Sequence, residues 1–512
     1  MNRRISELLR AALVVVCAWG GAATAAPAPA TKPSAPATRP AKALSPEEQK
    51  LVKLRDLSKT AVLALEGRKL DAAETALVEA LVIDPDNYTN VYNMACLRAL
   101  QGKSDDALAY LERAADAGFT DFVHLERDPD LNSLRELARY KKLVANRDVY
   151  QKKDADRALA SLKKQFGDKY LYEVDSPNKL VYVANTDAPT LAAVKKWLTA
   201  QAKSQWAELF DNKPDEYIVI LLPSAADYKK LIRQPGVEGV YMPQARTLIA
   251  RRLGQVMTHE FTHAMHAGDL DKSKQEHPIW VIEGIASMYE AGQFEGERLV
   301  PRDNYRLWFL QSAHKSGRLI PLEKLIKMEQ DELVKNATLG YGQSSSVMLY
   351  LYDQGLLKPF YQAFKAGLDK DPTGKAALEK VSGKPLKQFE KEWQAWMARR
   401  NPPAMSTGPD GAFLGVRFSQ ENDGLKIDEV VANGPAAKAG IKQADVIVGL
   451  GETDVRDQMS LMPMLKELQP GESVKFKVRR GQAYLDIAVT LGKRDDAAPA
   501  RRPEVPRGRG RG

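Results

Sequence analysis

The sequence predicts a multidomain protein whose 512 residues form an α-helical part, an α+β middle part and a β-rich part, in that order. Three observations predict this fold class. A repeat of period 34 occupies the first part. Strand-like apolar runs followed by helical patterns occupy the middle, as expected for a mixed-sheet lobe beside a helical lobe. The Pro-rich break "RRNPPAMSTGPDG" then opens the last part.

The start of the chain, residues 1–25, is typical of a secretory signal peptide. Three arginines precede the apolar run "AALVVVCAWGGAA", and "ATA" at Ala23–Ala25 supplies small residues for cleavage. The run is too short to span a membrane, and no later stretch reaches about eighteen uninterrupted apolar residues. We therefore expect a periplasmic or secreted protein without a transmembrane segment, in which residues 26–44 form an Ala/Pro-rich linker.

The two cysteines predict neither a lipid anchor nor an intrachain disulfide. Three valines precede Cys17, which is a poor context for lipoprotein cleavage. Removal of the signal peptide leaves Cys96 without a partner in the same chain. The stability of the protein is therefore expected to come from its apolar cores, which a chain of this length can build several times over.

The net charge of +9 does not indicate a nucleic-acid partner once it is located along the chain. Residues 1–25 carry +2, residues 26–44 carry +3 and residues 493–512 carry +4, so the middle of the chain is neutral. The end of the chain, residues 495–512, is a low-complexity Arg/Gly tail that we expect to be disordered and solubilising. No specific nucleic-acid binding is expected.

Residues 45–148 are expected to form helical repeats. The first unit carries Asp71, Ala73, Leu77 and Ala80, and these residue types recur 34 positions later as Asp105, Ala107, Leu111 and Ala114. This period and the segment "ALVIDPDN" resemble about two tetratricopeptide (TPR) repeats, followed by a divergent capping segment, "LERDPDLNSLRELARYKKLV". The resemblance implies a concave face for a peptide or protein partner, and a spacer role is the alternative.

Residues 149–402 are expected to form the α+β part. The runs "KLVYVAN", "YIVILLPS" and "TLIARR" are typical of strands, with an amphipathic helix between the first two. Four later segments, "LEKLIKM", "GYGQSSSVMLYLYDQG", "LLKPFYQAFKAG" and "LKQFEKEWQAWMARR", have helical patterns. The sequence therefore predicts a sheet-containing lobe followed by a helical lobe.

The stretch "VMTHEFTHAMH", residues 256–266, holds three of the six histidines of the chain. In a helix, His259 and His263 lie about 40° apart around the axis, so both imidazoles leave the same face. Glu260, offset by about 100° from His259, can lie beside a metal held there and hold a water. This H-E-x-x-H pattern predicts a zinc-dependent hydrolase, with structural core histidines as the alternative.

A third ligand is expected from "PIWVIEGIASMYE", which resumes a helical pattern after a charge-rich loop at residues 268–277. Glu283 in this segment lies twenty positions after His263. "HEFTH" followed by "WVIEG" at this separation resembles the gluzincin metallopeptidases, in particular the bacterial peptidase MA-like family. The resemblance implies one Zn²⁺ per chain bound by His259, His263 and Glu283, with Glu260 as general base. It also implies that "GVYMPQARTLIARR" forms an edge strand that pairs with an extended substrate, an ordinary hairpin edge being the alternative.

The carboxylate that orients the first histidine is not identified by the pattern. Four residues after the third ligand, where the thermolysin-type pattern often places this carboxylate, the sequence has Ser287. Glu290 and the loop acids Asp269 and Asp271 are the candidates for that role, and solvated surface acids are the alternative.

Three further side chains are candidates for the site. His266, seven positions after His259, shares the ligand face and is an alternative to Glu283. Tyr341 stands where the resembled family often carries a tyrosine near the metal, which implies a hydrogen bond to the oxyanion of the tetrahedral intermediate. A buried packing tyrosine is the alternative. His314 is a second candidate for that donor, or a surface residue.

The last folded part, residues 403–494, carries "GAFLGV" and "GLKIDEVVANGPAAKAGIKQADVIVGL" and resembles a bacterial PDZ domain over almost its full length. The resemblance implies a loop whose backbone N–H groups bind the C-terminal carboxylate of a peptide, beside a strand that pairs with that peptide. This loop comprises Phe413, Leu414, Gly415 and Val416. Ala444 replaces the usual glycine of the "A-G-x-x-x-D" turn, which puts the geometry of that turn in question.

The sequence thus predicts an exported zinc metallopeptidase that hydrolyses peptide bonds and recruits substrates or partners through PDZ and TPR-like modules. One alternative is an exopeptidase of the glycyl-aminopeptidase type, because that family also joins a gluzincin core to a C-terminal PDZ domain. The other is a non-catalytic periplasmic scaffold whose middle part holds a structural metal. The intact Glu260 argues against the scaffold, which has no use for a carboxylate between two histidine ligands.

Overall fold

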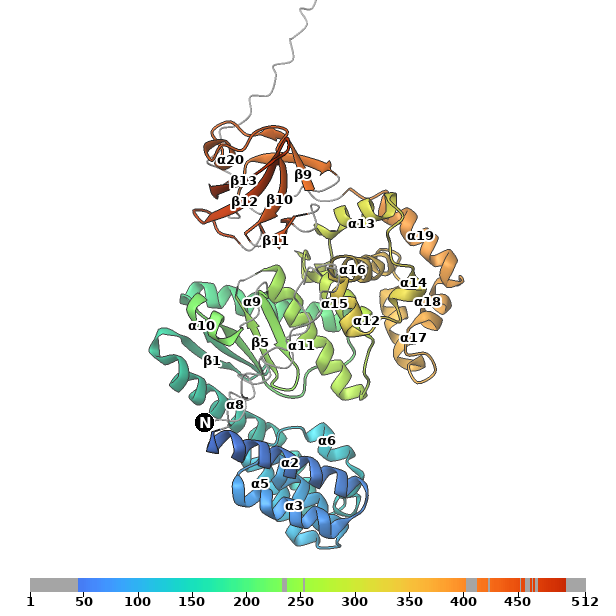
Figure 1. Cartoon of the computed structure of the whole chain (residues 1–512). Helices are drawn as coiled ribbons and strands as arrows, with labels where there is room; N and C mark the ends of the chain where they lie inside the picture. Colours follow the sequence, from blue (N-terminus) through green and yellow to red (C-terminus); the bar gives the residue numbers. More distant parts are fainter. Residues whose placement is uncertain are drawn as a thin grey trace, which may run out of the picture.

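The computed structural model describes residues 45–493 except 233–236, 252–253, 402–411, 422–423, 452, 456–460, 463 and 466–467. The predicted signal peptide, Ala/Pro-rich linker and Arg/Gly tail lie outside these residues, as does most of the Pro-rich break. Figure 1 shows the helical part at one end, the α+β part in the middle and the β-rich part at the other end. Within the described residues, every helix is too short or too polar to cross a membrane.

The first part is built from paired helices. The helices are α2 (Pro46–Glu66), α3 (Leu70–Ile83), α4 (Tyr88–Leu100), α5 (Ser104–Ala117), α6 (Phe122–Arg127), η1 (Pro129–Leu134) and α7 (Ala138–Ala145). Helix α2 packs on α3, and α4 packs on α5. The alanines and leucines that recur at period 34 are fully buried in α3 and α5. The repeat in the sequence therefore marks the inward faces of two successive helical hairpins.

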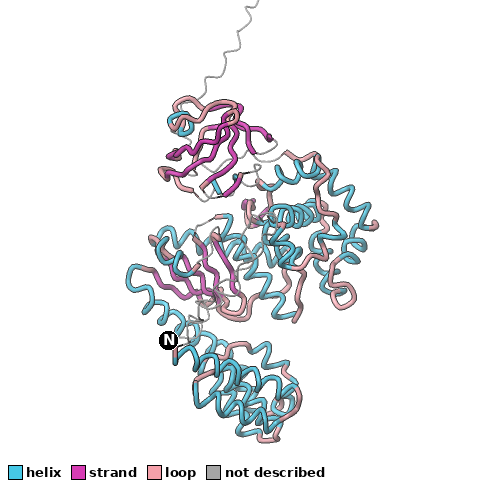
Figure 2. Tube along the Cα trace, viewed as in Figure 1, coloured by secondary structure: helices cyan, strands magenta, loops and turns pink. Residues whose placement is uncertain are grey.

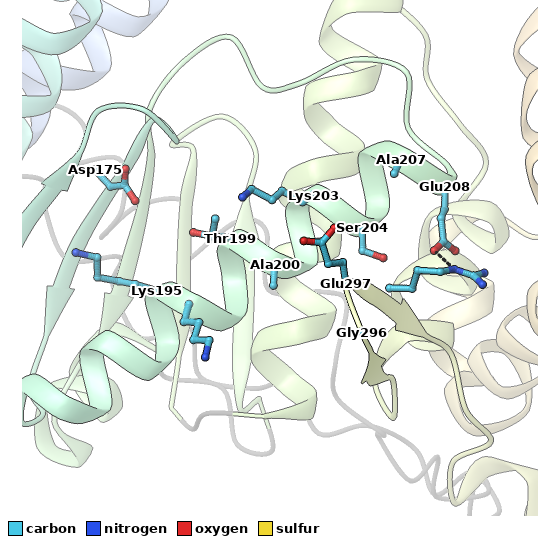
Figure 3. A pocket seen from close by; sticks show the side chains of 12 residues that line it. Asp175, Lys195, Thr199, Ala200, Lys203, Ser204, Ala207, Glu208, Gly296 and Glu297 are labelled. Carbon is cyan, nitrogen blue, oxygen red and sulfur yellow. Dashed lines mark hydrogen bonds and ion pairs between the residues drawn. The ribbon is translucent and has the colours of Figure 1, made fainter.

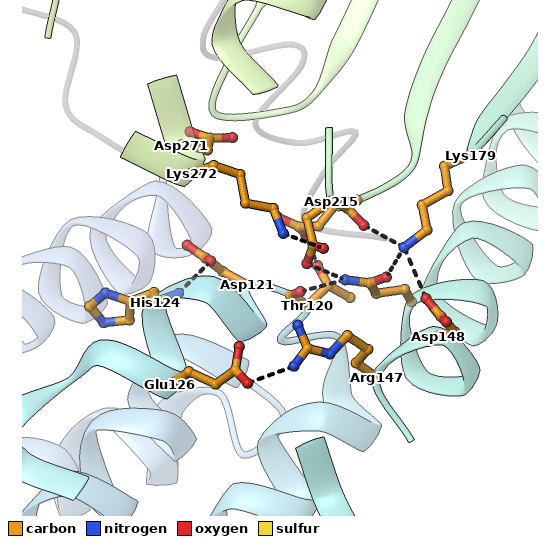
Figure 4. Close-up of polar contacts among 12 residues, drawn as sticks. Thr120, Asp121, His124, Glu126, Arg147, Asp148, Lys179, Asp215, Asp271 and Lys272 are labelled. Carbon is orange, nitrogen blue, oxygen red and sulfur yellow. Dashed lines mark hydrogen bonds and ion pairs between the residues drawn. The ribbon is translucent and has the colours of Figure 1, made fainter. Parts of the chain in front are cut away.

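Polar contacts around Asp215 join the helical part to the middle part (Figure 4). Helix α8 (Arg147–Phe166) begins at the junction, and the predicted boundary after residue 148 falls in its first turn. Gln151 of α8 donates both to the Thr120 carbonyl and to the Asp215 carboxylate, at 3.2 Å each. Lys272, near the end of the helix that carries the three clustered histidines, pairs with the same carboxylate at 3.1 Å. That helix is therefore tied to the helical part.

The middle part contains a five-stranded sheet, seen in magenta at the centre of Figure 2. Its spatial order is β1 (Leu171–Asp175), β2 (Leu180–Ala184), β3 (Ile218–Leu222), β5 (Thr247–Ala250), β4 (Gly239–Met242). Strands β2, β3 and β5 are parallel, and the two edge strands run antiparallel to their neighbours. Strand β4 is thus an edge strand. The pattern did not predict β1, because polar residues interrupt its apolar ones.

Helices cover the sheet and form a separate lobe. They are α9 (Ala188–Glu208), α10 (Ala225–Leu231), α11 (Gln255–Ser273), α12 (Ile279–Tyr289), α13 (Arg306–Lys315), α14 (Leu322–Leu325), α15 (Gln330–Lys335), α16 (Ala337–Asp353), α17 (Leu357–Gly367), α18 (Lys375–Ser382) and α19 (Leu386–Ala398), with a hairpin of β6 (Gln293–Glu295) and β7 (Arg298–Val300). One apolar core includes side chains from the sheet, α9, α11, α12 and the helical lobe. Helix α11 therefore lies between the sheet and the helical lobe.

The prediction of a loop over residues 268–277 is wrong for most of that range, because α11 continues to Ser273. Gly268 lets the loop at Pro214 approach closely, since a Cβ there would lie 2.7 Å from the Pro214 Cα. Asp269 is fully buried and accepts hydrogen bonds from Tyr361 at 2.7 Å and Lys365 at 2.6 Å. The local charge pattern indicated a solvated loop, whereas distant partners neutralise the buried carboxylate.

The β-rich part is built on an antiparallel sheet. Its elements are β8 (Val416–Glu421), β9 (Gly424–Val430), α20 (Pro435–Lys438), β10 (Val446–Leu450), β11 (Thr453–Asp454), β12 (Ser473–Arg480) and β13 (Ala483–Thr490). The order is β13-β12-β10-β9-β8, with β11 paired to β10. Ala444 adopts a φ of +70°, so the turn keeps the conformation for which glycine is usual and carries the strain of a side chain there.

Candidate metal centre

Helices α11 and α12 bring three predicted ligands together. The His259 and His263 Nε2 atoms lie 3.0 Å apart, and the Glu283 Oε2 atom lies 3.4 Å from the first and 3.6 Å from the second. One possible ligand atom from each side chain lies within 4.8 Å of the others. His259 and Glu283 are almost inaccessible to solvent, and His263 is partly exposed. The geometry therefore presents two imidazoles and one carboxylate to a single point.

Glycine and polar side chains determine how the two ligand helices pack. A Cβ on Gly284 would lie 2.9 Å from the Ser344 carbonyl oxygen of α16, so the glycine allows α12 to approach that helix. On the other side, Gln201 of α9 donates to the Thr258 carbonyl at 2.8 Å, and Gln205 donates to Thr262 Oγ1 at 2.8 Å. Since both acceptors flank the ligand turn of α11, α9 fixes the position of that turn.

Glu260 does not belong to the ligand cluster, because its side chain points toward the edge strand. Its Oε2 atom accepts a hydrogen bond from the Tyr241 backbone N–H of β4 at 2.7 Å. Burial raises the pKa of Glu260, and the charges of His259 and His263 oppose that shift only in part. A buried carboxylate with a raised pKa beside a candidate metal centre has the properties of a general base.

Strand β4 approaches α11 closely at Gly239, which leads to a prediction about stability. A Cβ at Gly239 would lie 2.4 Å from Val256 Cγ1 and 3.1 Å from Glu260 Cγ. We expect Gly239→Ala to destabilise the protein by about 1–3 kcal/mol, because the strand or the helix must shift. The matched control is Gly367→Ala, where an added Cβ meets nothing within 4 Å. Denaturant unfolding of both variants is the measurement, and equal stabilities would contradict this account of the packing.

Glu290 is the carboxylate that contacts the first histidine. Its Oε1 atom lies 2.9 Å from His259 Nδ1, the ring nitrogen that faces away from the cluster. Asn304 donates to its Oε2 atom at 3.3 Å, and Arg306 forms an ion pair with the same oxygen. Glu290 lies seven residues, about two helical turns, after Glu283, so the periodicity of α12 already places both on one side. Sequence reasoning missed Asn304 and Arg306, which no local pattern connects to the motif.

The other two candidates for that role lie elsewhere. Asp269 is buried beside Tyr361 and Lys365, as described above. Asp271 forms an ion pair with Arg246 at 2.8 Å near the junction with the helical part. Among these acids, Glu290 alone contacts His259 in the described residues.

His266 is not brought to the cluster. Its Nε2 atom lies 3.0 Å from His277 Nδ1, and its ring stacks on Phe210 with centroids 5.2 Å apart. Burial lowers the pKa of His277 to about 4 and also lowers the pKa of His266, so both rings are neutral at pH 7. The pair is a buried contact between α11 and the short loop after it.

The two candidate oxyanion donors differ in position. Tyr341 of α16 is buried, and burial together with the negative charge of Glu283 raises the pKa of its phenol. The raised pKa keeps the hydroxyl protonated at pH 7. His314 lies in the last turn of α13 and does not belong to the cluster of ligand atoms.

The buried charges of the cluster stabilise one another. Burial works against the charge of Glu283, but the two nearby imidazoles outweigh it and lower the pKa of Glu283 to about 2. Burial also works against a protonated His259, but contacts with the carboxylates of Glu283 and Glu290 raise the pKa of His259 to about 10. The centre therefore favours positive charge at the point where the ligand atoms meet.

Two other features of the described residues resemble sites. A cavity of about 560 Å³ lies over α9 and the β6–β7 hairpin, and Figure 3 shows that charged side chains line it. Two of these are neutralised by nearby acids, Lys195 by Glu173 at 2.5 Å and Arg298 by Glu208 at 2.7 Å. None of the lining residues belongs to the ligand cluster.

The second feature is a group formed by Cys96, Asp128 and Asp130 in the helical part. Asp128 accepts hydrogen bonds from the Tyr92 hydroxyl at 2.7 Å and from the Asp130 N–H at 2.9 Å. Burial, followed by the charge of Asp128, raises the pKa of the Cys96 thiol and disfavours the thiolate that a metal would need. Asp128 therefore serves as a helix cap.

The predicted peptide loop begins beside β13 and leads into β8. Phe413 exchanges two backbone hydrogen bonds with Gly492, at 2.8 and 3.1 Å. The Leu414 carbonyl accepts from the Ala436 N–H at 2.9 Å, and the Gly415 carbonyl accepts from the Val431 N–H at 2.9 Å. A trans peptide holds its C=O and N–H on opposite sides. The Gly415 and Val416 N–H groups, which belong to the same peptides as these two carbonyls, therefore point away from Ala436 and Val431.

Comparison with known proteins confirms the last domain. A PDZ domain model matches residues 412–491. Among curated proteins, the chain is similar to "Serine protease Do-like HtrB" of Bacillus subtilis, at 36% identity over 17% of this chain and 19% of that protein. It is also similar to "Probable periplasmic serine endoprotease DegP-like" of Chlamydia muridarum, at 37% identity over 13% of this chain and 14% of that protein. The chain thus spans less than a fifth of the length of these two relatives.

The chain is also similar to solved structures. The HtrA-type protease AlgW with decapeptide is 20% identical, with a TM-score of 0.16, over 22% of this chain and 35% of that chain. An aminopeptidase N family protein from Idiomarina loihiensis is 14% identical, with a TM-score of 0.27, over 63% of this chain and 67% of that chain.

Proposed function

We propose that the chain is an exported zinc-dependent metallopeptidase of the gluzincin type, and that its PDZ and TPR-like parts recruit substrates or partners. The observation that carries the proposal is the convergence of His259, His263 and Glu283 beside a buried Glu260 that is not itself a ligand. Export is supported by the signal-peptide pattern at the start of the sequence and by a relative that is named as periplasmic.

The residues present fit a zinc ion. Two nitrogens on one tetrahedral zinc lie about 3.3 Å apart, given Zn–N bonds of about 2.0–2.1 Å. The two Nε2 atoms are 3.0 Å apart, so little movement is needed. Within the described residues, the buried Glu283 Oε2 atom has no hydrogen-bond partner of its own. A zinc ion would give this oxygen a partner.

The number of ligands favours catalysis over a structural role. Structural zinc sites are closed by four protein ligands, whereas catalytic sites have three and an open position. Within the described residues, this cluster has three protein ligands, and one of them, His263, is partly exposed. The scaffold hypothesis has no explanation for a general base held beside such a centre.

The roles of the surrounding residues follow from their positions. Zinc, when bound, would polarise the scissile carbonyl and acidify the attacking water. Glu260, held by the Tyr241 N–H, would accept the proton of that water and deliver it to the leaving amine. Tyr341 would donate a hydrogen bond to the developing oxyanion. The edge strand β4 would pair with an extended substrate alongside these groups.

The PDZ domain would supply a second peptide site. Strand β8 is the edge of its sheet, and the Gly415 and Val416 N–H groups point away from Ala436 and Val431, which donate to the carbonyls of the same peptides. This arrangement suits the C-terminal carboxylate and the extended backbone of a bound peptide. A substrate tail held there would raise the local concentration of the rest of the chain near the zinc centre.

Metal removal tests the proposal. We expect about one zinc per chain, loss of peptide cleavage when a chelator removes it, and recovery when zinc is restored. Zinc at about 100 times its Kd should also stabilise the fold by about 2.7 kcal/mol. Metal analysis, cleavage of an unstructured peptide and thermal unfolding measure these effects.

A covalent inhibitor of serine proteases is the control and should have no effect. Cleavage that survives complete metal loss but stops with this inhibitor would overturn the zinc mechanism.

A further inference from the structure

A short segment at the start of α13 contacts both the metal centre and the PDZ domain. Arg306, the first residue of α13, is buried and forms an ion pair with Glu290, which in turn contacts His259 Nδ1. Three residues later, Phe309 is buried within an apolar cluster whose other fully buried members all belong to the PDZ domain. Residues three apart lie on neighbouring faces of a helix, so one turn of α13 makes both contacts.

Tyr305 strengthens this connection. Its ring packs against the same PDZ cluster and meets Phe309 edge to face, with centroids 5.9 Å apart. The Arg306 guanidinium lies over the Tyr305 ring, 5.1 Å from its centroid. Asn304 accepts the Arg306 N–H at 2.9 Å and donates to Glu290 at 3.3 Å. The segment Asn304–Phe309 therefore forms a continuous series of contacts from the PDZ core to the carboxylate that orients His259.

We infer that Arg306 positions His259 through Glu290, and that the PDZ domain sets the position of Arg306 through Tyr305 and Phe309. Outer partners of this kind hold the ring of a ligand histidine in the orientation that a metal requires. The sequence suggested only a recruiting role for the PDZ domain. In this arrangement, the domain also supports the metal centre. The inference rests on the proposed function, because it takes His259 as a metal ligand.

The primary test is metal affinity in the full-length protein. Zinc affinity is measured by competition with a chromophoric chelator, and the ligand geometry is followed by the absorption spectrum of the Co²⁺-substituted protein. Arg306→Ala should weaken zinc binding about 10- to 100-fold, as loss of an outer partner does. Phe309→Ala should weaken it by roughly 2- to 30-fold and shift the cobalt spectrum, because it acts from a distance. Phe309→Leu keeps an apolar side chain and should restore most of the affinity.

Two comparisons separate coupling from general destabilisation. Ser312→Ala alters an exposed residue of the same helix and should leave zinc affinity unchanged. In a double-mutant cycle, Phe309→Ala should add little to Arg306→Ala, because both act through one series of contacts. Fully additive losses, or an unchanged affinity and spectrum in Phe309→Ala, would overturn the inference. A wild-type protein that binds neither Zn²⁺ nor Co²⁺ would instead contradict the proposed function.

Discussion

The Glu260→Gln variant is expected to keep its zinc and its fold but to cleave peptides about 10²- to 10⁴-fold more slowly than the wild-type protein. Glutamine has the size of glutamate, and its amide oxygen can still accept the Tyr241 N–H bond that now holds the carboxylate. It cannot take a proton from the attacking water. The substitution therefore removes only the base, and peptide cleavage at matched zinc content measures what the base contributes.

A control for this variant lies on the same helix. Asp271→Asn also removes one carboxylate from α11, but that residue is exposed, and its half-buried partner Arg246 also pairs with Glu216. Because Arg246 keeps Glu216 as a partner, the loss should cost little stability, and cleavage by this variant should match the wild type. If Glu260→Gln also cleaves at the wild-type rate, the carboxylate is not a base and the cluster is structural.

Local periodicity explains why so much of the metal centre could be predicted. The relation of His259 to His263 depends on one turn of helix, and the spacing of Glu290 from Glu283 depends on two turns of another. Such short spacings can be read directly from the sequence. Spacing could not decide whether Glu290 or Asp269 contacts His259. That choice depends on distant partners, because Asp269 pairs with Lys365 and Glu290 pairs with Arg306.

The same reasoning explains what was missed in the fold. The continuous apolar runs of β2, β3 and β5 predict strands, and all three are present. Strand β1 is half-buried at an edge and mixes polar with apolar residues. The contact of Phe309 with the PDZ domain joins residues that are far apart in the sequence, so no local pattern signals it. The PDZ prediction itself is confirmed over residues 412–491.

Glu283→Gln is expected to have the largest effect on metal binding. The substitution keeps the shape of the side chain but removes the negative charge that faces the two imidazoles at 3.4 and 3.6 Å. Zinc prefers a carboxylate to a neutral amide, and two histidines alone leave the site one ligand short. We expect the variant to lose its zinc during purification and its peptide cleavage with it.

Glu290→Gln supplies the matched comparison, because it neutralises a carboxylate of the same size that touches His259 from the other side. Loss of an outer partner typically costs about 10- to 100-fold in metal affinity. Glu283→Gln should therefore weaken zinc binding more than Glu290→Gln, as measured by chelator competition under identical conditions. The reverse order, or full zinc retention in Glu283→Gln, would mean that the third ligand is a different residue. If both variants retain zinc fully, the two histidines must bind it with partners other than these carboxylates.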